Sequence, residues 1–452
     1  MKIMLLAAAA LIAAPVAAAP AKPVKPRAAV ARVAKPAPLP DTPEVQALRR
    51  AFTYAFPVYE MMRTRHGVVS RAQAAGVSGV NRLFVRKSLA DATTRDVTTP
   101  NDDTLYATAW LDLANGPVTL TVPDLGGRYH SAALINIFTD NVAILGSRTG
   151  GGGTYTIVGP AGGRAATDTN PVVQLDSNDA WLLVRVYVNG TGDLDAANAA
   201  IARYTLAGGG EPSPVRLVPT TSPDPVLFFD VVTEALGRSG IAPPAALSDA
   251  GFSGRITPLG TVKLATAALP RFRAGLKGGF AEVGPVVDGW SYPGPGIGNF
   301  GDDAAGRAAV ALGGLAALPR QEAVYLTASA DKDGAPLTGA KAYTVKIPPR
   351  PPVGAFWSLT MYKVEADGRL FFIDNPLNRF SLGSGSRSLH YERDGSLDIF
   401  VQTGKPSGER VVNWLPAPPG AFRLIWRAYL PKAELLDGSF RLPPVVASEA
   451  VP

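Results

Sequence analysis

The sequence is organised around one stretch, Thr99-Pro-Asn-Asp-Asp-Thr-Leu-Tyr106, which continues to Trp110-Leu-Asp112. This stretch places two adjacent carboxylates, an amide, hydroxyls and a phenol between a proline and an apolar run. The proline favours a turn, so we expect Asp102 and Asp103 to lie in a loop just before a strand. Inside a strand the two acids would point to opposite faces, whereas in a loop they can share one site.

The acidic pair has two functional interpretations and one structural alternative. Two carboxylates in a loop can bind a hard cation through oxygen, or one of them can act as a general acid or base. Alternatively, Asn101 and Asp102 use their side chains for hydrogen bonds to the backbone of a turn that leads into the strand. We therefore take Asp102 and Asp103 as candidate catalytic residues, and Asn101 and Tyr106 as candidate ligand-binding residues.

The first 40 residues are typical of export. Lys2, the apolar run Met4–Ala14 and the small residues that follow predict a signal peptide over residues 1–21. Residues 22–40 are rich in proline, alanine and lysine and predict a linker. The sequence therefore predicts a periplasmic or secreted protein, and no later stretch is long and apolar enough to predict a transmembrane span.

The net charge argues against nucleic acid as a partner. Of the net charge of +7, six positive charges lie in residues 1–40, which contain no acid, so residues 41–452 carry only +1. A nucleic-acid-binding domain needs a basic face of its own. The chain also contains no cysteine, which excludes disulfides, thiol catalysis and thiolate metal sites.

The composition predicts a mainly β protein of the α+β class. The chain has 47 glycines and 41 prolines, and its many short alternating runs favour sheets joined by turns. We expect a first helix from the cap Thr42 to Gly67, and a later helix from Asp193 to Ala207. Predicted strands of the first half cover residues 117–123, 129–138, 154–158 and 181–188.

The second half of the chain predicts helices followed by strands. Helices are expected over residues 225–236, 261–269 and 304–318. The run 355–363 alternates, with Phe356, Ser358, Thr360 and Tyr362 on one face. Further strands are expected over 342–347 and 422–430, and a hairpin over 389–400 that turns at Asp394-Gly395.

The chain resembles a bacterial family in which domain of unknown function 1254 is followed by domain of unknown function 1214. The first is indicated by Thr99–Tyr106, Trp110–Asp112, Gly116-Pro117, Val122–Asp124 and Gly127–Tyr129. The second is indicated by Phe356–Tyr362, Asn375–Phe380, Asp394–Ser396, Asn413–Pro418 and Leu436–Gly438. The segment Ile297–Gly301 between them also fits, and so many motifs in one order make a chance match improbable.

The resemblance implies an immunoglobulin-like sandwich, then a helical part, then a jelly-roll-like β domain. It implies no established activity, and the cofactor is unknown. We place the first β domain, with its leading helix, at residues 41–212. The helical insert is placed at 213–320 and the second β domain at 321–452.

Two further segments hold candidate site residues. Arg379, next to Asn378, can grip a carboxylate, a phosphate or a sugar hydroxyl through its planar donors, or it can be an internal tie to backbone carbonyls. Asn413 and Trp414 can form a stacking floor for a sugar, or they can be corner packing. We take Arg379 as a candidate catalytic clamp, and the other three as candidate ligand contacts.

Other known signatures are weak. The run Gly296–Gly301 fits a dinucleotide-binding pattern but does not follow an apolar strand, so we do not expect a dinucleotide site. The histidines, His66, His130 and His390, are far apart, and we expect no metal. His130 lies near the first β motif and remains a candidate acid or base.

Three functions remain open from the sequence. The first is an exported soluble protein that binds a carbohydrate or another small ligand of the cell envelope. The second is a hydrolase or lyase that uses Asp102 or Asp103 with Arg379. The third is a structural role in which the β-sandwiches assemble with partners or as a homo-oligomer. Whether the protein is an enzyme is undecided by the sequence.

Overall fold

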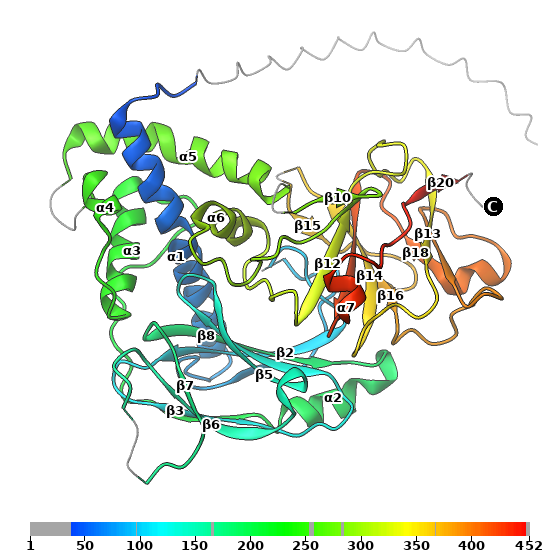
Figure 1. Cartoon of the computed structure of the whole chain (residues 1–452), viewed down its shortest axis with the longest axis horizontal. Helices are drawn as coiled ribbons and strands as arrows, with labels where there is room; N and C mark the ends of the chain where they lie inside the picture. The colour runs from blue at the N-terminus through cyan, green and yellow to red at the C-terminus, as the bar shows by residue number, and fades with distance from the viewer. Residues whose placement is uncertain are drawn as a thin grey trace, which may run out of the picture. The chain divides into compact units, whose positions relative to one another are not determined.

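The computed structural model describes residues 38–95, 97–163, 167–252, 257–281, 284–366 and 368–448 (Figure 1). The chain divides after Pro40 into two units, and the fold described below is that of Asp41–Pro452. The predicted signal peptide and residues 22–37 of the predicted linker lie outside the described residues.

The mainly β, α+β class is confirmed. Four sheets contain the strands β1 to β20 of the described residues. The helices are α1 (Pro43–Ala74), α2 (Leu194–Ile201), α3 (Pro225–Arg238), α4 (Ala245–Asp249), α5 (Leu259–Ala281), α6 (Ala304–Gly313) and α7 (Ala433–Leu436).

The first sandwich packs a five-stranded sheet on a four-stranded one. The larger sheet has the order β1 (Phe84–Arg86), β2 (Thr104–Asp112), β8 (Asp179–Tyr187), β4 (His130–Asn136), β5 (Asn141–Gly146). The smaller has the order β7 (Val172–Gln174), β6 (Gly153–Val158), β3 (Val118–Val122), β9 (Thr205–Gly208). Alternate residues of β2, among them Leu105 and Ala107, meet Val118 and Leu120 of β3 in one buried core.

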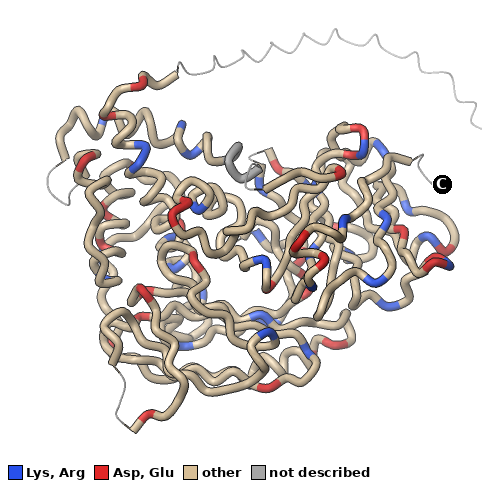
Figure 2. Tube along the Cα trace, viewed as in Figure 1, with Lys and Arg blue, Asp and Glu red and all other residues tan. Residues whose placement is uncertain are grey.

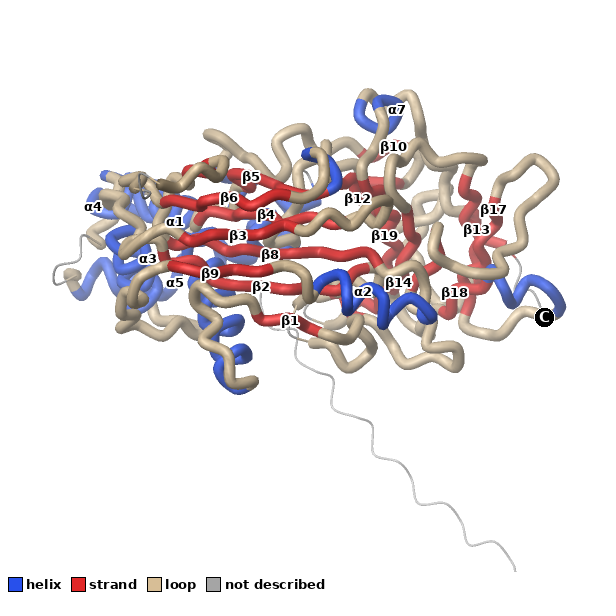
Figure 3. Tube along the Cα trace, turned by 90° about the horizontal axis from the view of Figure 1, so that it is seen from below, coloured by secondary structure: helices blue, strands red, loops and turns tan. Residues whose placement is uncertain are grey.

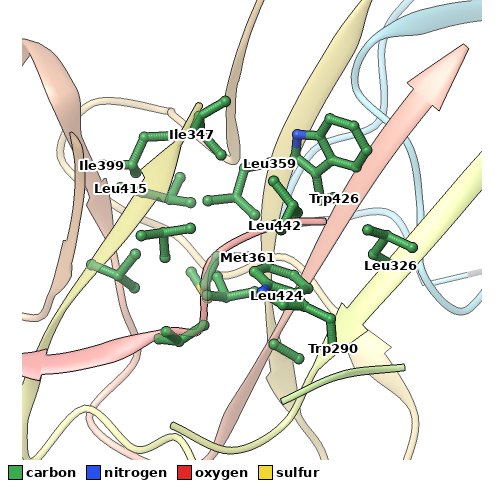
Figure 4. Close-up of a cluster of buried hydrophobic side chains, with 14 of the residues drawn as sticks. Trp290, Leu326, Ile347, Leu359, Met361, Ile399, Leu415, Leu424, Trp426 and Leu442 are labelled. Carbon is green, nitrogen blue, oxygen red and sulfur yellow. The ribbon is translucent and has the colours of Figure 1, made fainter. Parts of the chain in front are cut away.

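The second sandwich packs a seven-stranded sheet on a four-stranded one. The larger sheet has the order β10 (Val286–Val287), β11 (Trp290–Ser291), β12 (Ala323–Ala328), β19 (Phe422–Tyr429), β14 (Trp357–Val364), β15 (Leu370–Phe371), and β16 (Ser381–Gly383) also pairs with β14. The smaller has the order β18 (Trp414–Pro416), β17 (Leu397–Gln402), β13 (Ala342–Ile347), β20 (Val446–Ser448). Figure 4 shows their shared core, in which Leu359 and Trp426 from the larger sheet face Ile399 and Leu415 from the smaller.

The helices α3 to α6 pack around the long helix α1 rather than forming a separate layer (Figure 1). Thr42 caps α1 by accepting a hydrogen bond from the backbone of Val45, as its sequence predicts. The expected end at Gly67 is wrong, because α1 runs to Ala74. Val68 and Ala72 continue the buried face beyond Gly67, and this packing outweighs the low helix propensity of glycine.

Other predicted elements also differ from the structure. The helix predicted over 261–269 is longer, as α5 covers Leu259–Ala281, and the helix predicted over 304–318 ends at Gly313. The predicted helix from Asp193 ends at Ile201, and residues 205–208 form β9, where Leu206 pairs with Leu120 and enters the core. A turn lies at Asp394-Gly395 as predicted, but the segment before it is no strand, so the hairpin prediction is wrong. Residues 390–395 are exposed, so this segment has no face to bury against a sheet.

Acidic and basic residues are interspersed along the fold (Figure 2). One buried group ties α1 and α3 to the first sandwich. Asp179 on β8 accepts hydrogen bonds from the Trp110 indole at 2.7 Å and from Arg238 Nε and Nη2 at 2.9 and 2.8 Å. Arg65 of α1 lies 3.7 Å from the same carboxylate, which is 1% exposed.

We expect Asp179→Asn to destabilise the protein by about 3–5 kcal/mol, because it leaves two buried guanidinium groups without their shared carboxylate. Urea unfolding of the wild type and the variant measures this difference. The matched control is Asp333→Asn, whose side chain is 66% exposed and pairs with its neighbour Lys332, and it should change stability little. Equal stability of Asp179→Asn and the wild type would contradict the structural role given to this carboxylate.

Candidate functional site

The larger sheet of the second sandwich has two buried faces of opposite character. On β14, Leu359 and Met361 enter the apolar core, so Ser358, Thr360 and Tyr362 face the other way. On β19, Leu424 and Trp426 enter the core, and Arg427 and Tyr429 face the other way. Tyr325 of β12 lies on the same side as these residues.

We call this second face, together with the side chains of the first sandwich that lie against it, the polar layer. Figure 3 shows the strands of the first sandwich running toward β12, β19 and β14. Tyr129, Tyr187 and Phe356 join the two sandwiches, because Phe356 stacks on Tyr187 at 4.0 Å and on Tyr429 at 4.2 Å between ring centroids. Tyr129 also contacts Tyr429, at 5.1 Å between ring centroids.

The acidic pair lies in the loop immediately before β2, as predicted, and reaches into the polar layer. The Ser358 hydroxyl donates to Asp103 Oδ2 at 2.5 Å. The Ser381 hydroxyl lies 3.0 Å from Asp102 Oδ2 and 3.5 Å from Asp103 Oδ1. The structure therefore brings both carboxylates to one place, where they share the Ser381 hydroxyl.

The loop that carries the acids is held by its backbone and by Asn101. Asn101 Oδ1 accepts a hydrogen bond from the backbone of Asp103 at 2.8 Å, which is the turn-forming role expected of an asparagine. Its Nδ2 donates to the Tyr429 hydroxyl at 2.9 Å. The Tyr362 hydroxyl donates to the Pro100 carbonyl at 2.5 Å. Asn101 thus shapes the turn, which leaves the two carboxyl groups for other contacts.

Electrostatics place a proton on this pair near neutral pH. Burial and, to a smaller extent, the charge of Asp103 raise the pKa of Asp102 to about 7, against the opposing effects of Ser381 and Arg427. Burial also raises the pKa of Asp103, against the opposing effects of Arg427, Ser358 and Ser381. Asp102 as a residue is half-buried, yet its Oδ1 is buried and has no hydrogen-bond partner among the described residues.

Arg427 supplies the positive charge that acts on both acids. Its Nη1 donates to Thr360 at 2.7 Å and its Nη2 to the Tyr362 hydroxyl at 2.6 Å. The guanidinium also lies 5.7 Å from the centroid of the Tyr325 ring, and the residue is 4% exposed. Among the described residues no carboxylate forms a salt bridge with it, so its charge acts through space rather than in a pair.

The candidate clamp Arg379 has its hydrogen bonds elsewhere. Its Nη1 donates to the carbonyls of Val411, Val412 and Trp414 at 2.9, 3.3 and 2.8 Å. Within the described part of the chain, no hydrogen bond joins Arg379 to Asp102 or Asp103. Its neighbour Asn378 is exposed, in a left-handed backbone conformation with φ of 47°.

Asn413 and Trp414 face inward. Asn413 Nδ2 donates to the carbonyls of His390 and Asp398 at 2.7 and 3.0 Å. Trp414 is 1% exposed and its indole donates to the Gln402 carbonyl at 2.8 Å. Tyr106, by contrast, is half-buried in the polar layer, with the Arg185 guanidinium 5.7 Å from its ring centroid.

Five residues of this site were not predicted from the sequence as site residues, namely Ser358, Ser381, Arg427, Tyr362 and Tyr429. Ser358 and Tyr362 do occupy the polar side of the alternating run 355–363, which was the available signal. Arg427 interrupts the apolar strand β19, which was a second signal. Ser381 has no comparable pattern, because its role depends on β16 pairing with β14.

Other candidate sites carry less chemistry. A pocket of about 320 Å³ is lined by Leu113, Pro117, Asn178 and small residues, and a second of about 40 Å³ is lined by residues that include Arg65, His66 and Glu234. Neither includes the acidic pair. Across the described ranges no group of histidine and acidic residues is arranged to hold a metal ion. None of the described helices combines the length and apolar character that crossing a bilayer requires.

Comparisons with known proteins match two families, each described as a protein of unknown function. The model of DUF1254 matches residues 80–208, and that of DUF1214 matches residues 322–433. The crystal structure of the VPA0106 protein from Vibrio parahaemolyticus is similar with a TM-score of 0.65 and 24% identity, over 90% of this chain and 100% of that one. An uncharacterized protein from Burkholderia cenocepacia has a TM-score of 0.46 and 12% identity, over 91% of each chain. No curated protein matches.

The raised pKa of Asp102 predicts a pH-dependent effect of Asp102→Asn. Between the ordinary value of 3.8 and about 7, the folded chain keeps a proton that the unfolded chain releases. The free energy of unfolding of the wild type should therefore fall as the pH rises through this window, by at most about 1.4 kcal/mol per pH unit. The variant lacks this loss, so its stability relative to the wild type should improve from pH 4 to 7 and then level off.

Urea unfolding at each pH unit from 4 to 8 measures the effect. The exposed Asp374→Asn is the matched control and should differ from the wild type by a constant amount over the same window. A stability difference between Asp102→Asn and the wild type that does not change with pH would contradict the assignment.

Proposed function

We propose that this chain, which belongs to the family that joins a DUF1254 region to a DUF1214 region, is an exported protein that binds a hydroxyl-rich ligand of the cell envelope, such as a carbohydrate, at Asp102. The observation that carries this proposal is the Asp102 Oδ1 atom, which is buried without a hydrogen-bond partner among the described residues. A buried carboxyl oxygen without a partner is costly, so a ligand that supplies one gains binding energy there.

The chemistry of the acidic pair suits a hydroxyl group. A carboxyl with a pKa of about 7 exists in both protonation states near neutral pH, so it can donate or accept a hydrogen bond. A sugar hydroxyl also does both. The hydroxyl of half-buried Ser381 lies beside Asp102 and offers a second contact of the same kind.

Aromatic side chains support the same class of ligand. Half-buried Tyr106 and Tyr187 lie on the first-sandwich side of the polar layer. A tyrosine has an apolar ring face and a polar hydroxyl, so it can contact a ligand that has both apolar and polar surfaces. The amino-terminal charged, apolar and small-residue pattern supports export, and hence a ligand of the envelope.

Acid–base catalysis is the second candidate function, favoured by the titration of the same pair. An acid with a pKa of about 7 beside a second carboxyl is the arrangement in which one group holds a proton and the other is ionised. A hydrolase or lyase would use Asp102 as the acid or base, and Arg427 is better placed than Arg379 to stabilise negative charge.

The binding proposal predicts that members of a panel of neutral mono- and oligosaccharides bind the wild type and that Asp102→Ala binds them about 10- to 100-fold more weakly. This range corresponds to the loss of about 1.5–3 kcal/mol, the usual contribution of a hydrogen bond to a charged group. Isothermal titration calorimetry measures both affinities. Asp374→Ala, on the exposed surface, serves as the control and should bind as the wild type does. If no saccharide binds the wild type, or if Asp102→Ala binds equally well, the proposal fails.

Catalysis is distinguished by incubating the same saccharides with the protein and following products by mass spectrometry. If the second candidate holds, Asp102→Asn should retain binding within a few-fold and lose turnover by about 100-fold or more. The dependence of the wild-type rate on pH should show an ionisation near 7. If the saccharides bind but are not converted to products, the result supports the binding function and contradicts the catalytic one.

A further inference from the structure

A second part of the polar layer, around Arg185 of β8, is short of partners. Arg185 is 6% exposed, and its Nη1 is buried without a hydrogen-bond partner among the described residues. Its Nη2 has one long hydrogen bond, to the Ala316 carbonyl at 3.4 Å. A guanidinium has five N–H donors, and burying its charge without a counter-charge is unfavourable.

Among the described residues, the groups that act most strongly on the Arg185 guanidinium are phenols. Its neighbours are Tyr106, Tyr129, Tyr325 and Tyr429. Burial raises the pKa of Tyr129, Tyr325 and Tyr429 above the ordinary value, so these three are neutral at physiological pH. They can stabilise a cation with their rings or accept its hydrogen bonds, but they do not neutralise it.

Nearby carboxylates are engaged with other partners. Glu322 receives a hydrogen bond from the Tyr129 hydroxyl at 2.8 Å and one from Arg148 at 2.7 Å. Asp103 is held by Ser358. The other fully buried arginine of the layer, Arg427, has two short hydrogen bonds to hydroxyls. Arg185 is therefore a buried cation with N–H donors that have no hydrogen-bond partner among the described residues.

We propose that Arg185, with Tyr106 and Tyr325, forms a subsite for the anionic group of a ligand, a carboxylate or a phosphate. The planar fork of a guanidinium matches both groups through paired hydrogen bonds. Tyr106 and Tyr325 are half-buried, so the ligand approaches the guanidinium past their rings. Phenol hydroxyls beside the fork add donors for the remaining oxygens of the anion.

The subsite and the acidic loop belong to one layer. Tyr429 neighbours Arg185 and also receives a hydrogen bond from Asn101 of the loop that carries Asp102. The inference rests on the proposed function for the hydroxyl-bearing part of the ligand, which would make that ligand an acidic or phosphorylated sugar. The anion subsite itself can be tested without any sugar.

The test compares the melting temperatures of the wild type and Arg185→Gln with and without inorganic phosphate or acetate. Without an anion, Arg185→Gln should melt at the same temperature as the wild type or higher, because it removes an uncompensated buried charge. With phosphate or acetate far above its dissociation constant, the wild type should gain on the order of a few degrees and the variant none. Arg393→Gln, in an exposed loop, is the control and should respond as the wild type does.

Two results would overturn the subsite. One is an equal anion-dependent gain in Arg185→Gln and the wild type, and the other is no gain in the wild type with either anion. If Arg185→Gln does not fold, wild-type crystals grown with bromide decide instead. An anomalous peak within hydrogen-bonding distance of Arg185 Nη1 supports the subsite, and a water or no density there overturns it.

A final pair of probes separates this inference from the proposed function. Galacturonate should bind the wild type at least 10-fold more tightly than galactose, and the ratio should fall to about one in Arg185→Gln. Galactose binding with no preference for galacturonate would remove the subsite and keep the carbohydrate function. A response to phosphate or acetate without any saccharide binding would keep the subsite and remove the carbohydrate function.

Discussion

The structure depends on the docking of the acidic loop against the outer face of β14 and β19. A sheet that buries one apolar and one polar face needs a partner with complementary hydrogen-bonding groups on the polar side, because buried polar groups without partners are costly. The loop supplies those groups: its carboxylates accept from Ser358 and Ser381, and its Pro100 carbonyl accepts from Tyr362. One short segment of the first sandwich thereby provides hydrogen-bond partners for polar side chains on strands more than 250 residues away in the chain.

After this docking, the charges of the acidic pair and of Arg427 are not matched in direct salt bridges within the described part of the chain. Two carboxyl groups share the Ser381 hydroxyl, and the arginine that acts on both, Arg427, is bound to hydroxyls instead of to them. In a structural salt-bridge network, such as the one around Asp179, each carboxylate instead receives several donors and faces its cation directly. Groups whose ionisation is perturbed by burial and by a like charge are a feature of functional sites more often than of scaffolds.

The features that local sequence patterns predicted correctly are those that depend on interactions between residues close together in the chain. The proline and the Asx residues placed the acids in a loop before β2, and the alternation of 355–363 placed Ser358 and Tyr362 on one face. Features that depend on tertiary packing could not be predicted from these local patterns. Helix α1 continues past Gly67 because later residues of the helix are buried, and residues 205–208 form a strand because Leu206 packs in the core. The site shares this limit, since Ser381 and Arg427 join the acids only through the pairing of β16, β14 and β19.

The sequence alone could not show which arginine lies near the acidic pair, because the direction of a side chain depends on how its strand is paired. In the structure Arg379 donates hydrogen bonds to backbone carbonyls, whereas Arg427 faces the polar layer. The similarity to the Vibrio structure, at 24% identity, establishes the fold alone, so function has to follow from the groups that the fold leaves short of partners. Among the described residues of the polar layer, two such groups are the Asp102 Oδ1 atom and the Arg185 Nη1 atom, which favour a hydroxyl and an anion respectively. A ligand that carries both groups satisfies both deficits at once, which neither a neutral sugar nor a free anion can do.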